Sequence, residues 1–168
     1  YPCLENDGWQ PDMEAMEKKI NDKTKAIVVI NPNNPTGAVY SKKILKQIIN
    51  LAGQHNLIVL SDEIYSKLVY GSPEGFTAMA PLSNDVPVIA FSGISKNYLA
   101  PGWRTGWSIF HDPLQKAQKI KDAMFQLARM RLSTHYPFQF AIKAALEGPQ
   151  DHLKEVHVLH FLPSLFLH

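Results

Sequence analysis

Short runs of apolar residues alternate along this chain with longer segments in which apolar residues recur at helical spacing. Four of the runs are rich in apolar and β-branched residues, as buried strands are, and they cover residues 26–30, 57–60, 86–91 and 105–110. Strands of this kind are usually parallel, and the long connections between them leave room for crossover helices. The pattern therefore predicts an α/β fold, a three-layer α/β/α arrangement with a mostly parallel sheet.

Helix signals lie in the connections between these runs. Asp12, Ser41 and Asp112 each precede a segment of helical spacing, where a side-chain oxygen can accept hydrogen bonds from unpaired backbone N–H groups. Pro113 supports the third start, because proline is tolerated at the first helical position. The expected helices cover residues 13–21, 42–53, 114–130 and 138–146, and residues 71–84 are expected to form a long irregular connection.

Polar and charged residues come directly after three of the predicted strands. They are Asn34, in the loop Asn31-Pro32-Asn33-Asn34-Pro35-Thr36-Gly37, then Asp62 and Tyr65, and finally Ser95, Lys96 and Arg104. In open parallel sheets, ligands bind outside the carboxyl ends of the strands. We therefore expect these side chains to converge at one edge of the sheet, where a ligand would bind.

Each of these motifs also has a simpler explanation. The Asn-Pro-Gly loop has the composition of a tight turn, Asp62 is suited to cap a helix, and Tyr65 is suited to the core. Lys96 taken alone is most simply a solvated lysine. Its setting favours a functional role, because Ser95 precedes it and a Pro-Gly-Trp turn brings Arg104 back eight residues later. Such a loop can present N–H groups, a hydroxyl and a guanidinium to a phosphate.

Composition and charge argue against several classes of function. The 168 residues include 17 basic and 15 acidic side chains that are well mixed, and this pattern argues against binding to nucleic acid or to an anionic membrane. No apolar run approaches the roughly 18 to 20 residues of a membrane helix. The single cysteine, Cys3, has no partner for an internal disulfide, and the histidines show no metal-ligand spacing. We expect a cytoplasmic protein without a metal site.

A lysine able to lose its proton, a carboxylate, a phenol with an amide, and a phosphate site are together what pyridoxal 5'-phosphate (PLP) needs from a protein. On these motifs and their order, the chain resembles the class I/II aminotransferases, which are fold-type I PLP enzymes, over residues 1–150. The stretches 62–65 and 95–104 look most like the alanine and aromatic aminotransferase branch.

The resemblance implies a role for each residue. Lys96 matches the lysine that binds PLP covalently and later moves the substrate's proton. Asp62 matches the carboxylate that pairs with the pyridine N–H and keeps the ring an electron acceptor. Asn34 and Tyr65 match the two donors to the phenolate oxygen of the cofactor, and both favour its anionic form.

The phosphate ligands implied by the resemblance are Ser95 and Arg104. The sequence departs from the family pattern at Gly93, where many relatives carry a serine that also touches the phosphate. Ser92 or a backbone amide would have to take over that contact here. Replacing Asp62, by contrast, should remove the electron sink altogether.

The resemblance also implies that the chain is a fragment. Residues 1–150 match the carboxy-terminal part of the PLP-binding large domain, and residues 151–168 look like a divergent or truncated start of the segment that leads to the small domain. The chain begins at Tyr1, and residues 156–168 are apolar without a clear period. Family members are typically homodimers with active sites at the interface, so we expect this chain to anchor the cofactor but not to transaminate alone.

The implied reaction of the whole protein is the exchange of an amino group between an amino acid and a 2-oxo acid, with alanine or a similar neutral amino acid favoured. Other fold-type I enzymes, such as a lyase, a decarboxylase or a cyclopropane-forming synthase, could use the same anchors. From a different class, a PLP-binding module of a transcriptional regulator and a degenerate remnant without cofactor remain alternatives.

Overall fold

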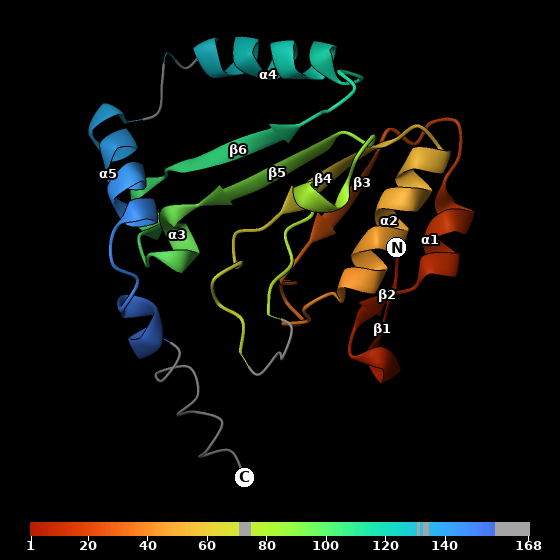
Figure 1. The fold of residues 1–168 in the computed structure, drawn as a ribbon, viewed down its shortest axis with the longest axis horizontal. Helices are drawn as coiled ribbons and strands as arrows, with labels where there is room; N and C mark the ends of the chain where they lie inside the picture. Colours follow the sequence, from red (N-terminus) through yellow and green to blue (C-terminus); the bar gives the residue numbers. More distant parts are fainter. Residues whose placement is uncertain (71–74, 131, 133–134, 157–168) are drawn as a thin grey trace.

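A computed structural model describes residues 1–70, 75–130, 132 and 135–156 of the chain (Figure 1). Its strands are β1 (Cys3–Leu4), β2 (Gln10–Pro11), β3 (Ala26–Ile30), β4 (Ile58–Asp62), β5 (Val88–Gly93) and β6 (Gly106–His111). Its α-helices are α1 (Met13–Lys19), α2 (Lys42–Gln54), α3 (Ile94–Asn97), α4 (Gln118–Met130) and α5 (Tyr136–Glu147). Short 3₁₀ turns cover Glu5–Asp7, Ala80–Leu82 and Pro101–Trp103.

The main sheet has the strand order β3-β4-β5-β6. The first three strands are parallel, with Ile30 opposite Asp62 and Asp62 opposite Phe91, whereas β6 runs antiparallel to β5 and places Gly106 opposite Gly93. The carboxyl ends of β3, β4 and β5 therefore lie at one edge of the sheet, and the chain enters β6 at that same edge. This topology confirms the predicted α/β class and its mostly parallel sheet.

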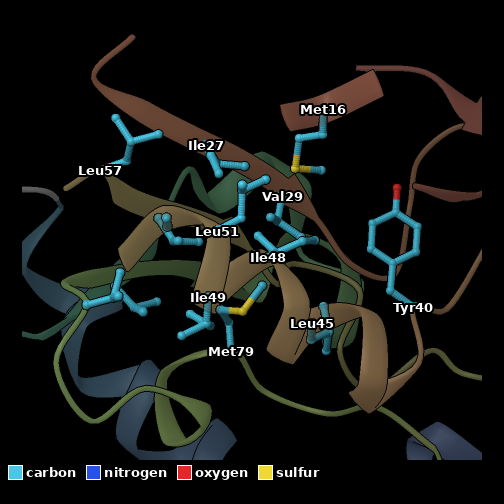
Figure 2. Packing of buried hydrophobic residues seen from close by; sticks show 14 residues of the cluster. Met16, Ile27, Val29, Tyr40, Leu45, Ile48, Ile49, Leu51, Leu57 and Met79 are labelled. Atoms are coloured by element: carbon cyan, nitrogen blue, oxygen red, sulfur yellow. The ribbon is translucent and has the colours of Figure 1, made fainter. Parts of the chain in front are cut away.

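The core lies where α2 packs against β3 and β4. Leu45 and Ile48 of α2 are fully buried, as are Val29 and Val59 of the two strands. Figure 2 shows the labelled side chains of α2 and β3 facing one another, with Met16 of α1 closing one side. These positions recur at helical spacing on α2 and at every second residue on the strands, which is why the apolar pattern predicted both elements.

Two of the predicted caps are present at the helix ends. Asp12 accepts a hydrogen bond from the backbone N–H of Ala15 at 2.9 Å, and Ser41 accepts one from that of Ile44 at 3.3 Å. α2 runs one residue beyond the expected end at Gly53, and α1 ends at Lys19, two residues before the expected end. Differences of this size are ordinary at helix ends, which fray.

The predicted start of α4 at residue 114 is wrong, because the helix begins at Gln118. Gln115 has a φ of 54°, and such a left-handed residue cannot continue a right-handed helix. Asp112 still caps the turn that precedes the helix, since its carboxylate accepts from the N–H groups of Lys116 at 2.9 Å and Ala117 at 2.7 Å. The prediction that Asp112 starts the helix is therefore wrong, because its carboxylate caps a turn that precedes the helix.

The strand predictions hold with small shifts. β3 has the predicted bounds, and β6 begins and ends one residue later than expected. β4 and β5 begin later than expected and extend to Asp62 and Gly93, two residues beyond the predicted ends. The polar edge residue Asp62 is thus the last residue of its strand. The irregular connection over 71–84 contains the turn Ala80–Leu82, and its residues 71–74 lie outside the described part.

Some short elements had no counterpart in the sequence analysis, notably the β1–β2 hairpin and α3. Cys3 in that hairpin is a free, half-buried thiol whose Sγ lies 3.5 Å from the hydroxyl of Tyr40.

The apolar tail lies outside the described residues from 157 onward. Within the described residues, none of the helices has the length and apolar character needed to cross a membrane.

Candidate cofactor-binding site

The residues predicted to form a site lie on the segments that leave β3, β4 and β5 and on the segment that enters β6. Asn34 follows β3, Asp62 ends β4, and Tyr65 lies in the turn after it. Lys96 lies in α3 directly after β5, and Arg104 stands two residues before β6. Because the sheet brings these strand ends to one edge, the residues share that edge as the sequence predicted.

The loop after β3 is held together by its own side chains. Asn31 is buried, its Oδ1 accepts from the N–H of Tyr40 at 2.8 Å, and its own N–H donates to the carbonyl of Asp62 at 3.0 Å. Asn33 Oδ1 accepts from the hydroxyl of Thr36 at 2.8 Å. Asn34 lies between these anchors and is exposed. The loop is therefore a tight turn that also holds Asn34 in an accessible position.

The turn after β4 begins with two carboxylates that have different surroundings. Asp62 is half-buried and its Oδ1 accepts from the N–H of Ile64 at 3.1 Å, a contact that caps a turn and not a helix. Glu63 Oε1 accepts from the hydroxyl of Ser61 and from the N–H of Met79, each at 2.9 Å. Burial raises the pKa of the Glu63 carboxyl. Glu63 therefore braces the turn from within.

Lys96 and Tyr65 come together across the two strand ends. The Lys96 Nζ lies 5.7 Å from the centroid of the Tyr65 ring, which is within the range of a cation–π contact. Lys96 is exposed and Tyr65 is half-buried. An amine that is open to a ligand therefore stands beside a phenol in a fixed turn.

The segment between β5 and β6 closes on itself. The N–H of Ile94 donates to the carbonyl of Thr105 at 3.3 Å, so the two ends of the loop meet at the sheet edge. Arg104 is exposed, has a φ of 49°, and donates from Nη1 to the carbonyl of Pro101 at 2.8 Å. Trp103 stacks on Phe138 of α5 with a centroid distance of 4.8 Å. Ser95 is half-buried at the start of this loop.

The close approach of β5 and β6 explains the glycine at position 93. A Cβ atom at Gly93 would lie 3.0 Å from the carbonyl oxygen of Thr105 and 3.2 Å from the Cα of Gly106. Both neighbours are backbone atoms, so a side chain could be accommodated only if one of the segments shifted. The departure from the family pattern at this position therefore has a local steric reason.

The donors at this edge fit the needs of PLP by their chemistry. An exposed amine, a carboxylate, a phenol and a guanidinium lie on adjoining strand ends. Among the described residues, no group of three or more His, Cys, Asp or Glu side chains is arranged to hold a metal ion. A shallow cavity of about 600 Å³ between the start of β6 and α5 is lined by other residues, Gly106, Gln139, Ile142, Lys143, Leu146 and Glu147.

The sequence analysis overlooked two residues that support this edge. One is Glu63, and the other is Asn97, whose side chain is buried directly after Lys96. A single polar residue that supports a loop leaves no periodic signal in a sequence, so only its contacts in the structure reveal it.

Comparison with known proteins agrees with this architecture. A mostly parallel α/β sheet of this kind is found in the fold-type I transferases, to which the structural neighbours belong. The chain belongs to the family of class I and II aminotransferases, because the model of that family matches residues 1–160.

Among curated proteins, the glutamate-pyruvate aminotransferase AlaA of Escherichia coli K12 is 45% identical over 151 residues, which cover 90% of this chain and 37% of that protein. The alanine aminotransferase of Mycobacterium tuberculosis H37Rv is also 45% identical, with 90% of this chain and 35% of that protein covered. The chain therefore spans little more than a third of the length of these relatives.

Solved structures show the same relationship. An alanine aminotransferase from Pyrococcus furiosus superimposes with a TM-score of 0.89 at 48% identity, covering 92% of this chain and 39% of that one. A tyrosine aminotransferase from Leishmania infantum has a TM-score of 0.87 at 30% identity and covers 93% of this chain and 42% of its own. The resemblance inferred from the motifs is thus confirmed at the level of the family.

Proposed function

We propose that this chain carries the cofactor-anchoring part of a PLP-dependent aminotransferase. The observation that carries the proposal is the meeting of Lys96 and Tyr65, 5.7 Å from Nζ to ring centroid, at the edge where β4 ends in Asp62. Family membership and the named relatives support the same reaction class. In this proposal, residues 1–150 belong to the PLP-binding large domain, and residues 151–168 begin the segment toward the small domain.

When bound, PLP supplies an aldehyde that captures amino groups and a ring that accepts electrons. Lys96 Nζ would hold the cofactor, and the same amine would carry the proton at the substrate's Cα. Asp62 keeps a proton on the ring nitrogen by its negative charge. Asn34 and Tyr65 donate hydrogen bonds to the ring oxygen and favour its anionic form.

In this proposal, the loop between β5 and β6 binds the phosphate group of the cofactor. The exposed guanidinium of Arg104 supplies charge-assisted donors, and the hydroxyl of Ser95 adds a neutral one. The steric limit at Gly93 removes one hydroxyl that relatives place there, so Ser92 or backbone N–H groups complete the set.

The substrates we propose are an amino acid and a 2-oxo acid, with alanine favoured because the named relatives are glutamate-pyruvate and alanine aminotransferases. We further propose that the whole protein is a cytoplasmic homodimer. The chain alone should not transaminate, since it spans about 37% of the E. coli relative. Steady-state exchange between alanine and 2-oxoglutarate by the purified 168-residue chain would contradict that part of the proposal.

Reductive labelling tests cofactor anchoring directly. The chain is incubated with PLP, reduced with borohydride and digested, and mass spectrometry locates the modified lysines. We expect the label on Lys96 at PLP concentrations that leave the other lysines unmodified. In the Lys96→Arg variant the selective label should disappear, whereas Lys116→Arg, an exposed change outside the site, should leave it in place. A label spread evenly over surface lysines in the unsubstituted chain would contradict the proposal.

A further inference from the structure

A buried asparagine follows the candidate catalytic lysine directly. Asn97 is the last residue of α3 and is only 2% exposed, although Lys96 beside it faces solvent. A buried amide is costly unless its donor and acceptor are both satisfied. The hydrogen-bond partners of the Asn97 side chain therefore indicate its role.

Both partners of the Asn97 amide lie in the turn that carries Tyr65. Its Oδ1 accepts from the backbone N–H of Lys67 at 3.2 Å, and its Nδ2 donates to the hydroxyl of Ser66 at 3.2 Å. That turn is closed in its own backbone, where the N–H of Leu68 donates to the carbonyl of Tyr65 at 2.8 Å. The amide thus holds the backbone immediately after Tyr65.

The main chain of Asn97 is fixed from the other side. The Nε2 of His152 donates to the carbonyl of Asn97 at 2.9 Å, and the His152 ring lies 5.4 Å from the ring of Tyr98. Gln150 Oε1 accepts from the Tyr98 hydroxyl at 3.3 Å. The segment of Asn97 and Tyr98 is therefore anchored to residues 150–152, and the Asn97 amide connects this anchored segment to the turn of Tyr65.

The hydrogen bonds of the Asn97 amide connect the segments that follow β4 and β5, beyond the last backbone hydrogen bonds between these two strands. The last paired residues are Asp62 and Phe91, and one further bond joins the N–H of Glu63 to the carbonyl of Phe91 at 2.8 Å. Beyond that point the two chains diverge into the turn of Tyr65 and the helix of Lys96. The side chain of Asn97 supplies the next hydrogen bonds between them.

We propose that Asn97 is a positioning residue, whose amide sets the turn of Tyr65 against the helix of Lys96 and so places the amine and the phenol for the cofactor. The inference rests on the proposed function, because it assigns Asn97 an effect on PLP anchoring. Asn97 acts through its neighbours and does not itself touch the cofactor. Loss of its amide leaves Lys96 and Tyr65 in the chain but lets their spacing vary.

A purely structural role predicts a different result, and Ser83 provides the matched control. Ser83 is also buried, at 3% exposure, and its hydroxyl also makes two hydrogen bonds, to the carbonyl of Val86 at 2.7 Å and from its N–H at 2.9 Å. It precedes β5 and so lies at the opposite edge of the sheet. Asn97→Ala and Ser83→Ala each remove two hydrogen bonds of a buried side chain, but only Asn97 lies at the site.

The experiment compares the unsubstituted chain with Asn97→Ala and Ser83→Ala by thermal melting and by reductive labelling over a range of PLP concentrations. We expect both variants to melt at lower temperature. Asn97→Ala should raise the PLP concentration for half-maximal labelling of Lys96 by about tenfold, a factor that corresponds to about 1.4 kcal/mol. Ser83→Ala should change it less than about twofold, since it leaves that spacing intact.

A spectroscopic measurement distinguishes an effect on the positions of Lys96 and Tyr65 from a general loss of stability. Hydrogen-bond donors to the ring oxygen of the bound cofactor lower the pH at which its visible absorption changes. This pH should therefore rise in Asn97→Ala, and it should also rise in Tyr65→Phe, which removes one such donor. Ser83→Ala should keep the value of the unsubstituted chain. Equal labelling curves and equal pH values for Asn97→Ala and the unsubstituted chain would overturn the inference.

If Asn97→Ala does not fold, a milder variant tests the positioning role of Asn97. Ser66→Ala removes one of the two contacts of the amide and retains Asn97. It should raise the half-maximal PLP concentration severalfold, and no change in a folded Ser66→Ala variant would overturn the inference. Failure of the proposed function looks different, because the unsubstituted chain itself would then show no selective label on Lys96, and both conclusions would fall.

Discussion

Buried and half-buried polar side chains hold the loops at the carboxyl edge of the sheet. Asn31, Glu63 and Asn97 each bond to the backbone of a neighbouring segment, at distances between 2.8 and 3.2 Å. Such groups stabilise a loop only when every donor and acceptor is paired. In this chain they fix the segments that carry Asn34, Tyr65 and Lys96.

At the same scale, the sequence placed the candidate site residues at the edge of the sheet, but it did not indicate the residues that support them. Asp62 and Lys96 were found because each closely follows a recognisable strand, which fixes the edge that they share. Glu63 and Asn97 were missed because their partners, Met79 and Lys67, are distant in sequence and become neighbours only in the fold. The steric need for Gly93 likewise depends on the antiparallel β6 beside it.

The Glu63→Gln substitution tests the bracing role of this carboxylate. Burial raises the pKa of Glu63 above its ordinary value, so the folded state binds the proton more tightly than the unfolded state does. The group therefore contributes stability at pH below its unfolded pKa, and that contribution is lost as the pH rises through the raised folded pKa. Glutamine retains an oxygen that can accept from Ser61 and Met79, and it does not ionise.

We expect Glu63→Gln to match the unsubstituted chain near pH 4 within about 0.5 kcal/mol and to become the more stable of the two as the pH rises to 7. Urea unfolding at a series of pH values measures the difference. Glu17→Gln, an exposed change on α1, serves as the control and should show no such trend. A variant that is less stable at pH 7 than at pH 4, relative to the unsubstituted chain, would show that the charged carboxylate is favourable here.

At the scale of elements, the success of a sequence prediction depends on length and burial. β3 was predicted with its observed bounds because five consecutive apolar residues fill it, and α2 was predicted to within one residue because one of its faces is buried along the helix. α3 has four residues and the β1–β2 hairpin has two per strand, and these lengths are too short to show a period. The start of α4 was missed because the left-handed Gln115 leaves no clear mark in the sequence.

The two longest helices should differ sharply in their tolerance of substitution. Leu45 on α2 is 0% exposed, whereas Leu127 on α4 is 63% exposed. Leu45→Ala should lower the free energy of unfolding by about 2 to 5 kcal/mol, because it removes buried methyl groups and leaves a cavity. Leu127→Ala should change it by less than about 0.5 kcal/mol, as exposed positions do.

Urea unfolding of both variants measures this pair, and alanine suits both sites because it is a good helix former. A loss for Leu127→Ala as large as that for Leu45→Ala would mean that α4 is packed against something in solution. Comparable small losses for both would instead mean that α2 is not the helix that carries the core.

At the scale of the whole molecule, apolar surface is distributed unevenly. The side of the sheet with β3 and β4 is packed against α2, but Val28 on β3 and Ile109 on β6 are 53% and 54% exposed. α4 and α5 have no buried residue in the part of the chain that the structure describes. In Figure 1 these two helices lie away from the side of the sheet that α1 and α2 cover. Exposed apolar side chains of this kind favour association.

The chain by itself should therefore self-associate as its concentration rises, and polar substitutions on α4 and α5 should reduce this. The triple variant Leu127→Gln, Met130→Gln and Phe140→Gln replaces exposed apolar side chains by a residue that keeps good helix propensity. Burial of apolar area drives association at roughly 25 cal/mol per Å², so their removal weakens any contact that uses them. Sedimentation velocity over a concentration series measures the shift toward monomer. Leu4→Gln, a single exposed change on β1, is the control and should have little effect. If the unsubstituted chain sediments as a monomer at every concentration, or the triple variant associates as strongly, these helices are not the surfaces through which the molecule associates.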